Sequence, residues 1–439
     1  MQQHLTRRQF VQTSAGLAAL AANPYWLTSR ARADEAKNER PLVGAIGLGG
    51  QGTGDARRAA EFGDIVAVCD VQRQHAERAR DQHFNKAEVY EDYRKLLDRK
   101  DVEAVTIGTP DHWHTEIALA ALDAGKHVYC EKPLTLTVDE GKQLVAAVKK
   151  SGKVMQVGTQ QRGDQFDLFG RAVATVRSGQ LGKIQKVTVQ LPLSTEEGGP
   201  FMAQPVPNGM NWDFWLGQAP QVDYCPERCH SRFRWWYEYS GGICTDWGAH
   251  HMDITHWALN VENSGPMTID GTKTKLPEIA GGFNTPKLVT VDYLYPGDIH
   301  VQLIAQPPGD EGVLFEGEKG RIFVNRGRIT GKPIEEQDAD AKLKESIMAD
   351  VEKLYKGNTA KMGNHMGNFF EAWKFGKWPI SDVESQHRSV SACHLANISI
   401  RLKRKLTWDA AAETFVGDSQ ADAMLKRAQR DPYKIRSVG

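Results

Sequence analysis

The chain lacks an excess of charge of either sign. Among its 439 residues, Lys and Arg total 55 and Asp and Glu also total 55, which gives a formal net charge of +0 at pH 7. Proteins that bind nucleic acid or an anionic membrane surface usually carry a clear excess of basic residues. We therefore expect neither nucleic acid nor a membrane among its partners. The hydrophobic fraction of 40% and the charged fraction of 25% are instead typical of a folded globular protein.

Long apolar runs are also missing. The short apolar run from Ser14 to Ala22 falls well below the roughly 20 residues that a transmembrane helix needs. It follows Thr6–Phe10, which contains two adjacent arginines, and it precedes Ala31-Arg32-Ala33. A basic start, a short apolar middle and an A-x-A end predict a signal peptide over 1–33, and the arginine pair resembles a twin-arginine signal. The predicted localisation is periplasmic or secreted; the alternative is a chance arginine pair in a frayed terminus.

Cysteine is scarce, with six residues in the whole chain. Cys69 and Cys130 fall in predicted strands, where small buried thiols are common. Cys225 and Cys229 are candidates for a short-loop disulfide in an oxidising compartment, although unpaired thiols are our first expectation. A structural metal site needs further ligands at C-x-x-C-like spacing, which the sequence does not show, so no metal is predicted.

A glycine-rich motif follows the apolar segment that ends at Ile46. It reads Gly47-Leu48-Gly49-Gly50-Gln51-Gly52, and the next apolar strand, 65–69, ends in Asp70. In a dinucleotide-binding βαβ unit, Gly47 permits the tight turn, Gly49 lets backbone approach the pyrophosphate, and Gly52 lets the helix pack on the strand. Gln51 is a further candidate for cofactor contact. Asp70 would hold the adenosine ribose and repel a 2′-phosphate, which favours NAD over NADP; the alternative is a glycine-rich surface turn.

The alternation of strands and helices continues to residue 160. Predicted strands at 105–108, 127–130 and 154–158 alternate with amphipathic helical segments, of which one opens with a capping box at Thr137–Glu140. This predicts a doubly wound parallel Rossmann sheet over 41–160, after a polar linker at 34–40. Ligands bind beyond the carboxyl ends of such strands. The cofactor-binding candidates at those ends are Thr109, Pro110, His112, His114, Glu131 and Lys132, although the two histidines are equally typical of packing residues.

These motifs together resemble the Gfo/Idh/MocA oxidoreductases, which include glucose-fructose oxidoreductase and inositol dehydrogenase. The most specific stretch is Ala124-Gly125-Lys126-His127-Val128-Tyr129-Cys130-Glu131-Lys132-Pro133. The resemblance implies that Lys132 lies at the reacting hydroxyl, that Glu131 contacts the nicotinamide ribose, and that Pro133 is a cis proline. It also favours a cofactor-side role for His114.

Beyond residue 160 the pattern changes to a helix at about 164–177 and then to strands, with alternating runs at 184–192, 288–294, 299–304 and 322–324. Strands that dominate this region predict an antiparallel or mixed sheet in a substrate domain over 161–414. The resemblance implies a large open sheet with one face used for oligomerisation, hence a homodimer or homotetramer. The polar tail over 415–439 is a candidate for wrapping a neighbouring subunit.

The segment 240–253 carries the second set of catalytic candidates. If it is a helix, Asp246, His250 and Asp253 lie at i, i+4 and i+7 on one face. The segment matches the family pattern Gly-Gly-x-x-x-Asp-x-Gly-x-His-x-x-Asp, which identifies His250, rather than His251, as the functional histidine. The alternatives are a helix cap with a satisfied core histidine, or a metal site formed by His250, His251, Asp253 and His256.

The resulting prediction is a sugar or polyol dehydrogenase. A hydrogen leaves the substrate carbon toward the nicotinamide, His250 or Lys132 takes the hydroxyl proton, and Asp246 orients the substrate or tunes the pair. A near-neutral pKa of His250 would suit that role. Gln160, Arg162 and Trp235 are weaker substrate-binding candidates, and His365 is weaker still. Eleven Trp, several of them between 212 and 257, suit either carbohydrate rings or ordinary core packing.

Two other functions remain open at this stage. Some exported relatives are NAD-dependent glycosidases, which oxidise a ring carbon transiently, eliminate the aglycone, add water and reduce again. A non-catalytic sugar-binding module that keeps NAD as structure is the third reading. Because no nicotinamide pool exists outside the cytoplasm, an exported enzyme of either catalytic kind is expected to hold its cofactor tightly.

Overall fold

The strands of the first domain are mostly apolar and buried, which is typical of a parallel sheet covered on both faces. The computed structural model describes residues 40–193, 197–307, 310–355 and 364–436, so the predicted signal peptide lies outside the described residues. Six strands lie in the order β3-β2-β1-β4-β5-β6, with every neighbouring pair parallel. They are β1 (Leu42–Ile46), β2 (Asp64–Cys69), β3 (Glu88–Tyr90), β4 (Ala104–Ile107), β5 (His127–Glu131) and β6 (Met155–Gly158). This order confirms the predicted Rossmann sheet.

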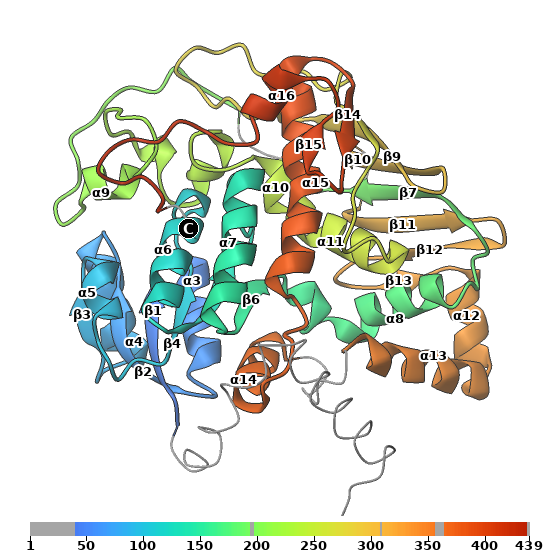
Figure 1. The fold of residues 1–439 in the computed structure, drawn as a ribbon, viewed down its shortest axis with the longest axis horizontal. Helices are drawn as coiled ribbons and strands as arrows, with labels where there is room; N and C mark the ends of the chain where they lie inside the picture. Colours follow the sequence, from blue (N-terminus) through green and yellow to red (C-terminus); the bar gives the residue numbers. More distant parts are fainter. Residues whose placement is uncertain (1–39, 194–196, 308–309, 356–363, 437–439) are drawn as a thin grey trace, which may run out of the picture.

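Helices cover both faces of this sheet (Figure 1). They include α3 (Gly50–Ala59), α4 (Arg73–His83), α5 (Tyr93–Leu97), α6 (Asp111–Asp123) and α7 (Val138–Ser151). The Thr137 hydroxyl caps α7 by accepting a hydrogen bond from the Glu140 backbone N–H, as its sequence predicts. α3 begins at Gly50, so the glycine motif itself supplies the first helical turn.

A helix from far along the chain completes this domain. α14 (His365–Phe375) packs Met366, Phe369 and Phe370 into the same core cluster as Val43 and Ala45 of β1. The helical spacing of Met366, Phe369, Phe370 and Trp373 predicts this apolar face from the sequence alone, but it does not predict that its partner is the first domain. A boundary at residue 160 therefore separates the two sheets and not the helices that cover them.

The second domain is built on a nine-stranded sheet in the order β13-β12-β11-β7-β10-β9-β8-β14-β15. Its strands are β7 (Ile184–Gln190), β8 (Thr268–Asp270), β9 (Val289–Tyr295), β10 (Ile299–Ala305), β11 (Gly312–Gly317), β12 (Gly320–Val324), β13 (Ile329–Thr330), β14 (Leu406–Asp409) and β15 (Thr414–Phe415). All neighbouring pairs are antiparallel except β7 with β10. The expectation of a mostly antiparallel sheet is confirmed.

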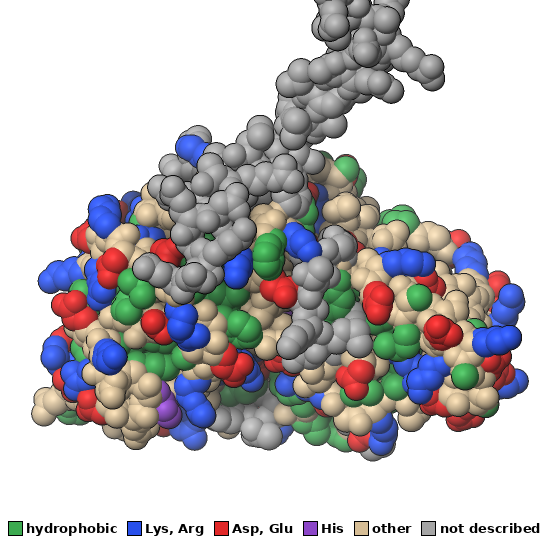
Figure 2. Space-filling view, turned by 90° about the horizontal axis from the view of Figure 1, so that it is seen from below, with side chains coloured by type: hydrophobic (Ala, Val, Ile, Leu, Met, Phe, Trp, Pro, Cys, Tyr) green, Lys and Arg blue, Asp and Glu red, His purple; other side chains and the backbone are tan. Residues whose placement is uncertain are grey.

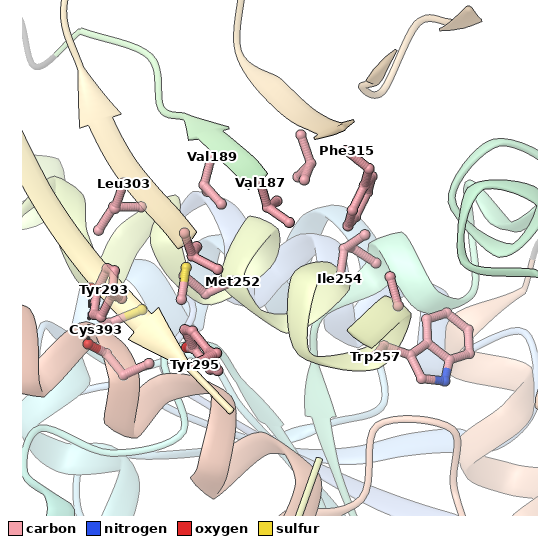
Figure 3. Packing of buried hydrophobic residues seen from close by; sticks show 14 of the residues in the cluster. Val187, Val189, Met252, Ile254, Trp257, Tyr293, Tyr295, Leu303, Phe315 and Cys393 are labelled. Carbon is pink, nitrogen blue, oxygen red and sulfur yellow. Dashed lines mark hydrogen bonds between the residues drawn. The ribbon is translucent and has the colours of Figure 1, made fainter. Parts of the chain in front are cut away.

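Helix α11 (Gly248–Leu259) lies between this sheet and the rest of the molecule. Almost every residue of α11 is buried, as expected for a helix that is covered on all sides. In Figure 3, Met252 and Ile254 of α11 point toward Val187 and Phe315 of the sheet. The other helices of this domain are α8 (Phe166–Arg177), α9 (Trp212–Leu216), α10 (Ile243–Asp246), α12 (Lys332–Ala339), α13 (Ala341–Leu354), α15 (Val383–Leu402) and α16 (Ser419–Ala423). This packing fixes the position of the α11 N-terminus, which faces the first domain.

The described part of the tail packs against its own chain. Arg430 Nη1 lies 2.6 Å from Asp213 Oδ1, and Arg436 Nη2 lies 2.8 Å from Glu116 Oε1 of α6. Tyr433 stacks on Phe214 with ring centroids 5.7 Å apart. Accordingly, the last described residues of the tail lie beside α6 (Figure 1).

The surface agrees with the balanced composition. Figure 2 shows acidic and basic side chains interspersed over the coloured part of one face. Among the described residues, no helix combines the length and the apolarity needed to cross a bilayer. All six cysteines lie in the described ranges as buried free thiols, Cys225 and Cys229 included.

Candidate active site

A cavity of about 730 Å³ lies at the carboxyl ends of β1, β2, β4 and β5. The strand order reverses at β1, and open α/β sheets bind their ligands at such a point. The opposite wall comes from the second domain: the 3₁₀ helix His230–Trp235, the end of α10, the start of α11 and the turn after β12. One continuous cavity therefore joins the glycine motif to the catalytic candidates of both domains.

The glycine motif leaves the space that a dinucleotide needs. Gly47 has a φ of +80°, and a Cβ there would lie 2.6 Å from Thr109 N. A Cβ on Gly52 would lie 1.9 Å from Gly47 O, so Gly52 allows α3 to pack against β1. Gly49 and Gly50 line the cavity with open space around them, and α3 has no side-chain N-cap. The first N–H groups of α3 are thus available to a pyrophosphate, and the motif fits NAD.

Asp70 stands at the end of β2 and lines the same cavity. Its carboxylate accepts hydrogen bonds from the backbone N–H groups of Leu48 at 2.7 Å and Gln72 at 2.9 Å. These bonds hold the carboxylate beside the glycine turn, in the place where a ribose would donate its hydroxyls. The geometry agrees with the predicted preference for NAD.

Lys132, Asp246 and Arg234 form a charged cluster at the other end of the cavity. Lys132 Nζ donates to Asp246 Oδ1 at 2.6 Å, and Arg234 Nε donates to the same oxygen at 3.0 Å. Burial would raise the pKa of Asp246, but the charges of Lys132 and Arg234 and their hydrogen bonds outweigh it and lower this pKa to about 2. Asp246 therefore stays ionised and fixes the Lys132 ammonium at the cavity wall.

His250 lines the cavity one helical turn beyond Asp246. The predicted helix through both residues is in two pieces, because α10 ends at Asp246 and α11 begins at Gly248. Burial lowers the pKa of His250 well below its ordinary value, and the charges of Lys132 and Arg326 lower it further. The near-neutral pKa expected for this histidine is therefore corrected downward: the imidazole is neutral near pH 7 and able to accept a proton.

Glu131 sits between the two ends of the cavity. Its Oε1 accepts from Gln160 Nε2 at 2.5 Å and from Gln51 Nε2 at 3.2 Å. Gln160 and Gln51 were expected to contact substrate and cofactor; both line the cavity, and both also orient Glu131. Buried behind them is Asp55, whose pKa is raised by burial and by the charge of Glu131.

Several predicted site residues do not line the cavity, Arg162, His112 and His114 among them. Arg162 is fully buried, with Nη2 2.6 Å from Asp253 Oδ1, so it pairs with Asp253 instead of binding substrate. His112 is buried with Nε2 2.9 Å from Trp215 O. His114 lies beneath the cavity, where Nδ1 is 2.7 Å from Pro133 O and Nε2 is 2.9 Å from Thr109 O. His114 therefore connects two loops that do line the cavity, and the Lys132–Pro133 peptide is cis, as expected.

The structure also brings in residues that sequence reasoning missed. Arg234, Trp247 and Arg326 line the cavity beside the predicted Trp235, Asp246 and His250. Arg326 comes from the turn between β12 and β13, and its Cζ lies 4.5 Å from the centroid of the Trp247 ring. The Asn325-Arg326-Gly327 stretch signals a turn, but no local pattern connects that turn to a site in another part of the chain.

The metal alternative finds no support in this part of the chain. Among the described residues, no group of three His, Cys, Asp or Glu side chains is placed to hold a metal ion. Its proposed members have other partners: His251 lies against Glu311, Asp253 against Arg162, and His256 against the Tyr295 hydroxyl.

Comparison with known proteins agrees with this geometry. Residues 42–159 match the Gfo/Idh/MocA profile described as an oxidoreductase family with an NAD-binding Rossmann fold. Residues 195–435 match the C-terminal alpha/beta domain of the same oxidoreductase family. The two matches together cover most of the chain.

Individual relatives are more distant. Inositol 2-dehydrogenase of Salmonella typhimurium is 28% identical over 279 residues, which cover 60% of this chain and 71% of that protein. Myo-inositol 2-dehydrogenase of Thermotoga maritima is 25% identical over 305 residues, which cover 68% of this chain and 79% of that protein. The WlbA dehydrogenase of Bordetella pertussis, solved in complex with NADH and UDP-GlcNAcA, shares the fold with a TM-score of 0.62 at 17% identity, over 85% of this chain and 99% of that one.

Proposed function

The chain belongs to the Gfo/Idh/MocA family of NAD-binding oxidoreductases, and we propose that its substrate is a sugar or polyol whose hydroxyl is oxidised at Lys132 and His250. The observation that carries this proposal is the Lys132–Asp246 ion pair of 2.6 Å, placed with His250 in the cavity that the glycine motif opens. The names of the relatives, inositol 2-dehydrogenases among them, point to the same substrate class. The comparisons support this oxidoreductase function over the glycosidase and binding-module alternatives.

When NAD is bound, it supplies the acceptor for the hydride that leaves the substrate carbon. Lys132 Nζ donates a hydrogen bond to the reacting hydroxyl oxygen and stabilises the negative charge that develops there. Asp246 remains ionised and holds Lys132 Nζ in place through its hydrogen bond, and the neutral imidazole of His250 accepts the hydroxyl proton. A positioned base of this kind contributes roughly 10²–10⁴ in rate. The partly buried face of Trp235 gives the sugar ring an apolar wall.

The first test uses the purified protein without added cofactor, with absorbance followed at 340 nm while sugars, inositols and aryl glycosides are added. We expect a rise with one or more free sugars or polyols and no aglycone release. NAD is then added back to the same samples. Aglycone release without a lasting change at 340 nm would replace the dehydrogenase by the glycosidase. Silence in both assays, with and without NAD, would favour the binding module.

We further propose that the enzyme is exported by a twin-arginine signal over 1–33 and works in the periplasm or outside the cell with tightly held NAD. Support comes from Arg7 and Arg8 with Phe10 at the expected offset. Replacing both arginines with lysine should retain the protein in the cytoplasm on cell fractionation. Equal export of the lysine variant would contradict this route.

The oligomeric state is proposed to be a homodimer or homotetramer that uses the open face of the nine-stranded sheet. On that face Leu294, Ile304, Leu314 and Phe323 are only partly buried within one chain. Light scattering of the wild type should give a multiple of 48.9 kDa, and Leu314→Arg should reduce it toward the monomer mass. A monomeric wild type would overturn this proposal.

A further inference from the structure

Arg326 is a guanidinium in the cavity wall, beside the catalytic cluster, that no assigned role explains. Its turn is held rigidly: Asn325 Oδ1 accepts from the backbone N–H groups of Gly327 and Arg328, both at 2.9 Å. The Arg326 side chain lies over Trp247, the residue between Asp246 and α11. It is thereby positioned beside the catalytic cluster, although its strand lies in a distant part of the sequence.

Within the described ranges, Arg326 has no anionic partner that would explain this position. Its Nε is buried without a hydrogen-bond partner, and no ion pair between described residues includes its guanidinium. Other arginines of this region are paired: Arg234 with Asp246, and Arg328, two residues along the same turn, with Asp310. A guanidinium offers five N–H donors, and leaving them unsatisfied in a partly buried site is unfavourable.

The carboxylates around Arg326 are committed elsewhere. Glu311 acts on Arg326 through space, but its Oε2 lies 2.9 Å from His251 Nε2. Asp246 is shared by Lys132 and Arg234. Asp111, farther along the cavity wall, accepts from the Ser240 hydroxyl. Glu131, which also acts on Arg326 through space, accepts from Gln160 and Gln51. Among the described residues, no carboxylate therefore lies within ion-pair distance of Arg326.

Resting on the proposed function, we propose that the substrate is an acidic sugar, whose carboxylate or phosphate group binds Arg326 while its reacting hydroxyl binds Lys132. A planar guanidinium matches both kinds of oxyanion with two parallel hydrogen bonds. The Trp247 ring beneath Arg326 holds the guanidinium plane in place. Substrate specificity is then set by a residue of the second sheet, and the chemistry by Lys132 and His250.

The charge of Arg326 also bears on the base. It is one of the groups that lower the pKa of His250, after burial and Lys132. A substrate anion that neutralises Arg326 weakens this effect, so that protonation of His250 becomes more favourable. Binding and proton transfer thus favour the same acidic substrates.

The test compares matched probes that differ only in the anion: D-glucose with D-glucuronate and D-glucose 6-phosphate, and D-galactose with D-galacturonate. Binding to the NAD-loaded full chain is measured by calorimetry, and oxidation at 340 nm. We expect the wild type to bind at least one acidic probe more tightly than the matched neutral sugar. Comparing D-glucuronate and D-galacturonate with D-glucose 6-phosphate shows whether the bound group is a carboxylate or a phosphate. Arg326→Met should weaken that binding by about 10- to 100-fold and change the neutral sugars little. Arg326→Lys should restore part of it.

Arg328→Met, on the same turn but exposed, is the control for folding and should match wild type. Equal binding of acidic and neutral probes, no binding of any acidic probe, or a preference that survives in Arg326→Met overturns the inference. If the protein oxidises neutral sugars and Arg326 has no effect, the proposed dehydrogenase function stands and the acidic substrate is wrong. If acidic sugars bind in an Arg326-dependent way but NAD is not reduced, the acidic ligand stands and the proposed dehydrogenase function is wrong.

Discussion

Lys132 Nζ lies 2.6 Å from Asp246 Oδ1, although the two residues are 114 positions apart and belong to different domains. The contact joins the carboxyl end of β5 to the end of α10. Since a single carboxylate oxygen also accepts from Arg234, the position of the catalytic ammonium depends on how the two domains pack. Catalysis is therefore sensitive to both partners of this pair.

Lys132→Met should lower kcat by at least about 10³-fold, because charge stabilisation at the reacting oxygen is lost. Asp246→Asn should lower kcat less, by roughly 10²-fold, since Lys132 remains but loses the anion that orients it. NAD affinity, measured by fluorescence titration, should change little in either variant. A kcat of Lys132→Met within tenfold of wild type would remove Lys132 from the chemistry.

The pH dependence should identify His250 as the base. Its pKa is depressed in the folded protein, so the imidazole is unprotonated near neutrality and gains a proton only in acid. The value of kcat/KM should therefore be constant around pH 7 and should decline only when the pH is well below 6.5. His250→Asn should lower the plateau by about 10²-fold or more and abolish this acidic limb. An acidic limb that persists unchanged in His250→Asn assigns the base elsewhere.

Acid should destabilise the protein through other buried histidines. The pKa values of His112 and His256 fall to about 3, and those of His365 and His394 to about 4, because burial disfavours the charged imidazole. The unfolded chain binds protons at about 6.5, so stability is complete above that pH and declines as the pH falls toward 4. By pH 5, each of these imidazoles should lower the free energy of unfolding by on the order of 2 kcal/mol. Thermal unfolding from pH 7.5 to 4.5 measures the decline; an unchanged Tm contradicts it.

The glycine motif offers a matched pair of variants on one helix. In Gly52→Ala the new Cβ would lie 1.9 Å from Gly47 O, so α3 must move away from β1. We expect at least a tenfold loss of NAD affinity and about 1–3 kcal/mol of destabilisation. Gly54 has nothing within 4 Å of an added Cβ, and Gly54→Ala should gain up to about 1 kcal/mol from helix propensity. Equal effects of the two changes would discount close packing at Gly52.

Arg162 should behave as a structural residue. Its Nε and Nη2 donate to Asp253 at 2.7 and 2.6 Å, and both side chains are excluded from solvent. Arg162→Met leaves Asp253 buried without its cation and should cost about 3–5 kcal/mol. Arg80, which pairs with Asp81 at the surface, is a control, and Arg80→Met should cost at most about 1 kcal/mol. A stable Arg162→Met with a raised KM would restore its predicted role at the substrate.

Local sequence determined much of this protein. Apolar strands, the Gly47–Gly52 turn and Asp70 define the nucleotide half, because each requirement there is met by residues close in the chain. The motifs around Lys132 and His250 likewise identified the catalytic candidates before their geometry was known. The regular alternation of strands and helices predicts the doubly wound parallel sheet, although not its strand order.

Only the tertiary structure decided how these groups are used. Arg162 and Arg326 both look like isolated cations in sequence, yet one is buried against Asp253 and the other faces the cavity unpaired. α14 has the predicted apolar face but covers the first domain, and the tail returns to α6. Periodicity shows which face of an element is buried, because that depends on local geometry. It does not show which other element that face packs against, because contacts between residues distant in sequence depend on the packing of the whole chain.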